Sequence, residues 1–156
     1  MRIMRSFLLF VGVMLLQWWW NTHLAYWGAA PQFLLALTVL IAARRGSVTA
    51  MLIGFAWGIF VDTLRADLFG ANALLYTVAG YWAGMARKQI DLRAMGPLAA
   101  VVFILSWGYT LMIGVVGLVF QKSFLWIGWV PALLTPFLNA LTASVAAVVW
   151  EAWGEP

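Results

Sequence analysis

Two long apolar stretches constrain the fold of this chain more than any other feature. The first runs for 38 residues from Ser6 to Ala43 and is broken only near residues 21–23. The second runs from Val48 to Ala86 and is interrupted around Asp62. Only 9% of all residues are charged and 65% are apolar, whereas a soluble domain has roughly a quarter of its residues charged. Lipid must therefore be the solvent for most of the surface, and we predict an integral membrane protein.

The lengths of these stretches predict six helices. One crossing takes about 20 apolar residues, so each stretch fits two short helices, and a third pair follows the charged residues 87–93. We expect a single all-α transmembrane domain over residues 1–156, a six-helix bundle with helices near 6–22, 27–43, 48–65, 69–86, 97–120 and 129–150. Pro31 is expected in the first turn of the second helix, and Pro131 and Pro136 are expected to kink or delay the sixth. Five helices with one re-entrant segment remain the alternative.

The positions of the basic residues predict that both ends of the chain face the cytoplasm (N-in/C-in). Six crossings in this orientation place seven basic residues inside: Arg2, Arg5, Arg44, Arg45, Arg87, Lys88 and Arg93. Only Arg65 and Lys122 fall outside, as the positive-inside rule requires. The net charge of +4 therefore reflects membrane topology and gives no indication of nucleic acid. Tryptophans gather at the expected membrane edges, which is typical of an aromatic belt: Trp18, Trp19, Trp20, Trp27, Trp126, Trp129, Trp150 and Trp153.

Small residues recur at helical spacing in the third and fourth expected helices. Gly54 and Gly58 form a GxxxG motif, and Gly80 and Gly84 form a second one. Such motifs let two helices approach closely. Packing of the two helices against each other is the favoured interpretation, and a surface for a partner helix is the alternative.

Asp62 is the most informative single residue, because it is a carboxylate within an otherwise apolar segment. Ionisable groups in such segments are costly unless they are paired or hydrated. Arg65 follows three residues later on the same helical face and is a candidate partner. A structural role and a contact with a partner or ligand are both open interpretations. In the turn that follows, Gly70 permits a tight bend, and Asp67 or Asn72 is expected to cap the next helix.

The sequence offers little for catalysis, and we expect neither a cofactor nor a metal. There is no cysteine and a single histidine, His23, so thiolate chemistry, a histidine metal site and a catalytic triad are excluded. Asp62 and Asp67 are the one candidate acidic pair. A spacing of five residues places them about 140° apart on a helix, which argues against a shared metal.

With these elements in place, the chain resembles the family of the rod shape-determining protein MreD. The resemblance covers the whole length in hydropathy and is most specific from about residue 31 to residue 88. It rests on Gln17, on Pro31 before Phe33-Leu34-Leu35-Ala36-Leu37, and on Arg44-Arg45-Gly46. The most characteristic motif is Gly54-Phe55-Ala56-Trp57-Gly58-Ile59-Phe60-Val61-Asp62, followed by Leu68-Phe69-Gly70-Ala71-Asn72-Ala73-Leu74 and Gly80-Tyr81-Trp82-Ala83-Gly84. Gln32 departs from the pattern, in which an acid often follows the proline.

The resemblance implies a non-enzymatic scaffold of the cell-wall (peptidoglycan) elongation machinery in the inner membrane of a rod-shaped bacterium. Its direct partner would be MreC, through which it would connect to RodA, a class B penicillin-binding protein and MreB. Membrane lipids and a second copy of the chain are further expected contacts. The resemblance also implies a fold similar to the substrate-binding (S) subunits of energy-coupling-factor transporters. The alternative function is therefore a capture subunit for a vitamin-like small molecule. The candidate partner or packing residues are Gly54, Gly58, Asp62, Arg65, Gly70, Asn72, Gly80 and Gly84.

Overall fold

The computed structural model describes residues 2–24, 28–64 and 68–152, and the side chains from residue 11 onwards. Over these ranges the chain forms helices and no strand, which confirms the prediction of an all-α fold. The helices are α1 (Arg2–His23), α2 (Phe33–Arg45), α3 (Ser47–Leu64), α4 (Ala71–Ala86), α5 (Met95–Gln121) and α6 (Trp129–Ala152). Three of them, α3, α5 and α6, are long and apolar enough to cross a membrane.

The second helix begins later than the sequence predicts. α2 starts at Phe33 instead of residue 27, and Pro31 lies before the helix instead of in its first turn. A proline disfavours helical geometry in the residue before it, and the backbone at residues 31–33 is bound by side chains from other helices, as described below. α6 begins at Trp129 and continues through Pro136.

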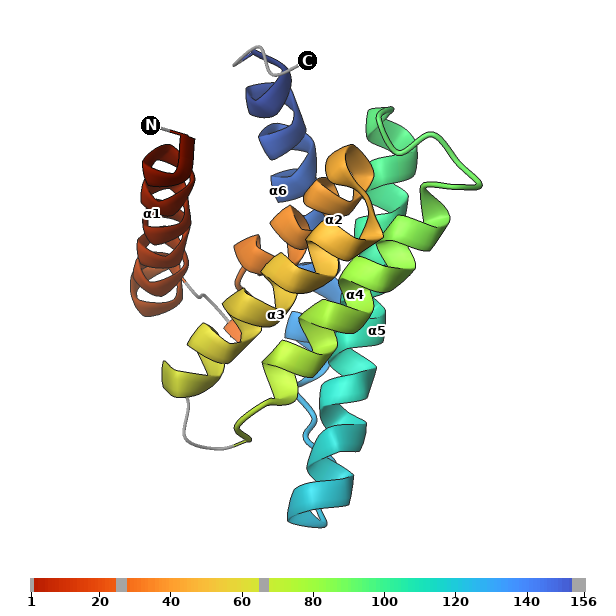
Figure 1. Cartoon of the computed structure of the whole chain (residues 1–156). Helices are drawn as coiled ribbons and strands as arrows, with labels where there is room; N and C mark the ends of the chain where they lie inside the picture. Colours follow the sequence, from red (N-terminus) through yellow and green to blue (C-terminus); the bar gives the residue numbers. More distant parts are fainter. Residues whose placement is uncertain (1, 25–27, 65–67, 153–156) are drawn as a thin grey trace.

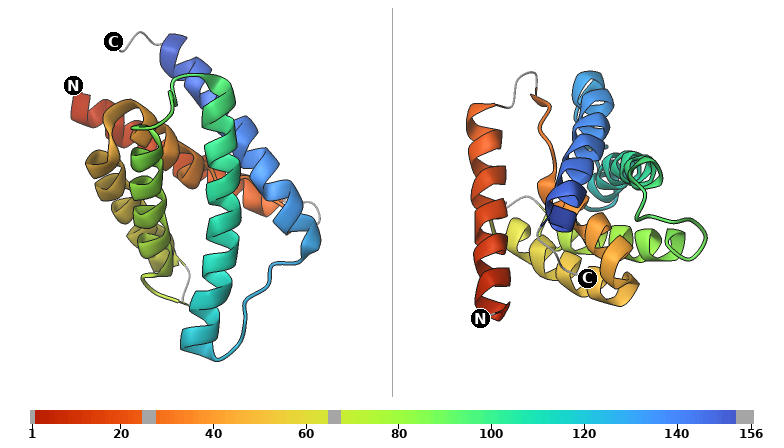
Figure 2. Two further views of the ribbon diagram at one scale, coloured as in Figure 1. Left: turned by 90° about the vertical axis from the view of Figure 1, so that its right-hand side faces the viewer. Right: turned by 90° about the horizontal axis from the view of Figure 1, so that it is seen from above.

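The helices run alternately up and down (Figure 1). The start of α1, the α2–α3 turn, the α4–α5 loop and the end of α6 all lie at the upper end in this view. The end of α3, the start of α4 and the α5–α6 turn lie at the lower end, and α5 reaches further down than α3 or α4. The right-hand view of Figure 2 shows that α1 lies at the edge of the bundle.

α2 is the centre of the bundle although it is the shortest helix. It contacts every other helix, and nine of its 13 residues are buried. Leu35, Ala36 and Leu40 have no exposed surface. A helix that is apolar on all sides is typical of a core position. At 1.5 Å per residue α2 is only about 20 Å long, which is shorter than the hydrocarbon core of about 30 Å.

Close contact between α3 and α4 depends on glycine. A Cβ atom on Gly58 would lie 2.2 Å from the Cα of Ala73, and one on Gly54 would lie 2.8 Å from the carbonyl oxygen of Tyr76. On α4, a Cβ on Gly84 would lie 2.2 Å from the Cβ of Ser47. The glycines of both motifs therefore face the neighbouring helix of the same chain, where a side chain would separate the two backbones.

Gly58 provides a test of this packing. Gly58→Ala should lower the stability of the purified protein by about 1–3 kcal/mol, because the backbone of α4 must move to admit the methyl group. Gly108→Ala is the matched control, since no atom lies within 4 Å of the added Cβ. Thermal unfolding in detergent measures both variants, and equal unfolding temperatures would contradict the close approach.

Candidate functional site

The carboxylate of Asp62 binds the start of α4. Its Oδ2 accepts hydrogen bonds from the backbone N–H groups of Gly70 and Ala73, both at 3.0 Å. Its Oδ1 accepts from the backbone N–H of Asn72 at 3.1 Å and from the Asn72 side-chain amide at 2.8 Å. Asp62 is 2% exposed. Its side chain thus serves as the N-terminal cap of a helix other than its own.

The local sequence explains this arrangement. Gly70 is the N-cap residue of α4 and has a φ of 93°, in the left-handed region, which glycine adopts without a steric penalty. Glycine has no side chain to accept from the first N–H groups of the helix, and these groups are normally bound by a capping side chain. Asp62, near the end of α3, supplies the missing acceptor, and its negative charge lies at the positive end of the α4 dipole.

Asn72 extends the contact to α5. While its amide nitrogen donates to Asp62, its side-chain oxygen accepts a hydrogen bond from the hydroxyl of Tyr109. The ring of Tyr109 stacks on that of Tyr76, with 5.8 Å between the ring centroids. One carboxylate and one amide therefore connect α3, α4 and α5 by polar contacts.

A second polar cluster binds the start of α2. The side chain of Gln17, on α1, donates to the carbonyl oxygen of Pro31 at 2.8 Å and accepts from the N–H of Phe33 at 2.7 Å. The side-chain oxygen of Asn139, on α6, accepts from the N–H of Gln32 at 2.6 Å. Two N–H groups and one carbonyl oxygen at this helix start are thus bound by side chains from both α1 and α6.

Asn139 also connects α6 to α5. Its amide nitrogen donates to the hydroxyl of Ser106 at 2.9 Å, and Asn139 has no exposed surface. The Ser106 hydroxyl in turn donates to the carbonyl oxygen of Val102 within α5. A buried amide in an apolar environment is favourable only when its donors and acceptor are bound. Here both the oxygen and the nitrogen of the Asn139 amide form hydrogen bonds.

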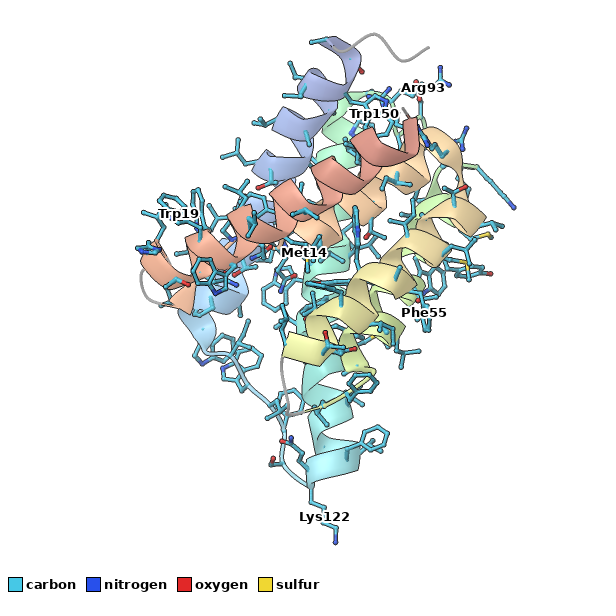
Figure 3. The ribbon with its side chains drawn as sticks, turned by 60° about the vertical axis from the view of Figure 1, so that its left-hand side comes forward. Met14, Trp19, Phe55, Arg93, Lys122 and Trp150 are labelled. Atoms are coloured by element: carbon cyan, nitrogen blue, oxygen red, sulfur yellow. The ribbon has the colours of Figure 1, made fainter. Side chains whose placement is uncertain are left out.

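The upper end of the bundle carries charged contacts. Arg44, at the end of α2, forms an ion pair of 2.6 Å with Glu151 of α6. The guanidinium of Arg45 lies 5.5 Å from the ring centroid of Trp150. These contacts join the ends of α2 and α6, where Trp150 and Arg93 are labelled in Figure 3. Lys122 lies at the opposite end of the molecule.

The structure brings together some of the residues predicted from sequence and separates others. Asp62, Gly70 and Asn72 form one cluster. Gly54, Gly58, Gly80 and Gly84 lie between α3 and α4 and contribute no chemical group. Arg65 and Asp67 lie outside the described residues, so the predicted pairing of Arg65 with Asp62 stays a prediction. Within the described ranges, no group of three histidine, cysteine, aspartate or glutamate side chains is placed to hold a metal ion.

Sequence reasoning did not identify the roles of Gln17, Ser106, Asn139 and Tyr109. Each is a polar residue within a mostly apolar helix, and that pattern alone marks a candidate for a buried polar contact. The sequence could not show which backbone groups they bind, because their partners lie up to 107 residues away.

These features define an all-α membrane protein whose buried polar side chains bind the chain's own helix starts. A family model described as rod shape-determining protein MreD matches residues 1–150. The chain therefore belongs to the MreD family, as its motifs predict, and that family acts in determining rod shape. Neither a curated protein nor a solved structure matches the chain.

Substitution of Asp62 tests its capping role. Asp62→Ala should destabilise the protein by about 3 kcal/mol or more, because it leaves several buried N–H groups without an acceptor. Asp62→Asn should have an intermediate effect, since one acceptor oxygen remains. Asp91→Asn is the matched control, in an exposed carboxylate that accepts from the N–H of Arg93. Thermal unfolding of the purified variants would contradict the capping role if Asp62→Ala and Asp91→Asn were equally stable.

Asn139 allows a separate test at the start of α2. Asn139→Ala should raise amide hydrogen exchange at residues 32–36 and lower stability by about 1–3 kcal/mol, because the Gln32 N–H loses its acceptor. Thr142→Ala is the control, since the Thr142 hydroxyl donates only to a carbonyl of its own helix. Hydrogen exchange followed by mass spectrometry measures both variants. Unchanged protection of residues 32–36 in Asn139→Ala would show that Asn139 does not hold this helix start.

Proposed function

We propose that this chain is a non-enzymatic scaffold of the bacterial rod-shape complex that holds the transmembrane helix of MreC. The observation that carries the proposal is the family match over residues 1–150 of 156. The protein would lie in the inner membrane as a multi-pass bundle. RodA, the class B penicillin-binding protein and MreB would be reached through MreC.

The arrangement of charge supports an orientation with both termini in the cytoplasm. Arg44 and Arg45 close α2, and the basic residues of the α4–α5 loop lie at the same end of the bundle. Lys122 lies at the other end (Figure 3). Basic residues favour the cytoplasmic side of a membrane, so the upper end in Figure 1 would face the cytoplasm.

The buried polar groups support a structural role over a catalytic one. A carboxylate offers about four acceptor positions, and four donors from the α4 start already bind Asp62. Asn139 is similarly engaged with Gln32 and Ser106. The transporter-like alternative, capture of a vitamin-like molecule, is not favoured, because the groove that the described residues form between α4 and α5 is lined almost entirely by apolar atoms.

The outward side of α3 is our candidate surface for the MreC helix. Because the glycines of α3 face α4, they are not available to a partner. On the exposed side of α3, Val48, Leu52 and Phe55 are 69%, 68% and 53% exposed, and Phe55 is labelled in Figure 3. Over the described residues α3 contacts α2 and α4 alone. A second copy of this chain is the competing occupant of the same surface.

Co-purification with MreC tests this proposal. Leu52→Trp should reduce the recovered MreC about fivefold, because a bulky ring prevents close helix packing worth about 1 kcal/mol. Val145→Trp is the matched control, at a position on α6 that is 56% exposed. Equal recovery of MreC with both variants would place its helix elsewhere. If Leu52→Trp lost self-association while the recovery of MreC was unchanged, the α3 surface would be assigned to a second copy. Failure of the wild-type chain to recover MreC would overturn the proposed partner.

A further inference from the structure

An apolar groove of about 410 Å³ opens between α4 and α5. Leu75 and Ala86 mark its two ends on α4, and Met112 and Val101 mark the corresponding ends on α5. Its lining is apolar almost throughout. In water such an exposed apolar surface would be unfavourable, but in a bilayer the hydrocarbon chains of lipids can cover it.

The length of the groove matches one leaflet of a membrane. Leu75 to Ala86 and Val101 to Met112 each cover eleven helical steps, or about 16 Å at 1.5 Å per residue. Half of a hydrocarbon core of about 30 Å is about 15 Å. The groove is thus as long as the hydrocarbon layer of the leaflet that borders the α4–α5 loop.

The width of the groove favours an acyl chain over a helix. Its volume divided by this length gives a mean cross-section of about 25 Å². A helix with side chains is at least about 10 Å across, which corresponds to about 80 Å². A narrow hydrocarbon chain therefore fits within the groove, whereas a helix would lie mostly outside it.

The two ends of the groove differ in charge. The α4–α5 loop lies next to Ala86 and carries Arg87, Lys88 and Arg93 against one acid, Asp91. Lys88 and Arg93 are exposed. Near the other end lies Tyr109, whose ring stacks on Tyr76 and whose hydroxyl donates to Asn72. An anionic head group is therefore favoured at the basic end of the groove, next to Lys88 and Arg93.

The position of Trp82 agrees with a lipid head group at the basic end of the groove. It lines the groove one turn from Ala86 and is 58% exposed. Exposed tryptophan is enriched near the level of the lipid head groups, so its position agrees with a head group at the loop.

From the size, polarity and charge of this groove, we propose that it binds one acyl chain of an anionic phospholipid whose head group lies against Lys88 and Arg93. The site is separate from the surface of α3 assigned to MreC. It gives this protein a preferred lipid at the α4–α5 edge. With the basic residues facing the cytoplasm, as proposed above, this lipid lies in the cytoplasmic leaflet.

Gly108 offers a way to fill the groove without disturbing the fold. It lies in the lining of the groove, and no atom lies within 4 Å of a Cβ placed on it. Gly108→Leu should therefore occupy the space of the acyl chain. Ile104→Trp, at a lining position that is 66% exposed, gives a second, independent obstruction. Gly12→Leu is the matched control, a helical glycine of α1 whose Cβ would also meet no atom within 4 Å.

The test measures bound lipid on the full chain. The protein is exchanged into vesicles with equal amounts of phosphatidylglycerol and phosphatidylcholine, released in mild detergent and analysed by native mass spectrometry. The wild-type chain and Gly12→Leu should retain one phosphatidylglycerol. Gly108→Leu and Ile104→Trp, with wild-type thermal unfolding, should lose it. Lys88→Gln with Arg93→Gln should lower the preference for phosphatidylglycerol about 25-fold, since each of the two basic residues near an anionic surface contributes roughly a fivefold preference.

Three results would overturn the proposal. Retention of phosphatidylglycerol by both folded obstruction variants would show that the lipid binds elsewhere. An unchanged preference in the Lys88 and Arg93 double variant would remove the head-group assignment. Equal retention of the two lipids by the wild-type chain would show that the groove does not select an anionic lipid.

Discussion

A helix that starts inside a bilayer exposes backbone N–H groups where no water is present to bind them. α2 and α4 have 13 and 16 residues, so each is shorter than the hydrocarbon core of about 30 Å. Both starts are bound by side chains from other helices: Asp62 at α4, and Gln17 with Asn139 at α2. Since an unbound buried donor costs about 1–3 kcal/mol, these contacts make two short helices compatible with a membrane interior.

The same contacts determine how the bundle is assembled. In lipid the hydrophobic effect does not drive helices together, so close packing and hydrogen bonds must do so. The glycines at the α3–α4 contact bring the end of α3 close to the start of α4, and this proximity lets Asp62 reach Gly70 and Ala73. Asn72 and Tyr109 carry the connection to α5. Packing and capping therefore support each other, and the loss of either should weaken both.

The hydrogen bonds of the buried polar side chains bear on the function of the protein. Asp62, the most informative residue of the sequence, and Asn139 are both bound by the protein's own backbone and side chains. What the described structure presents to the membrane is apolar: the outward side of α3 and the groove between α4 and α5. Surfaces of this kind agree with the two proposals made above, a contact with another helix and a contact with lipid.

The sequence by itself determined that lipid surrounds most of the surface, that the fold is helical, and to which family the chain belongs. Hydropathy alone requires lipid around most of the surface, and the motif around Gly58 and Asp62 indicates the MreD family. Only the tertiary structure decided where α2 begins and what the polar residues bind. Helix periodicity depends on neighbours three or four positions away, whereas Asn139 binds the N–H of Gln32 across 107 positions. Side chains that are distant in the sequence bind the backbone at the start of α2. A local sequence pattern does not show which side chains these are.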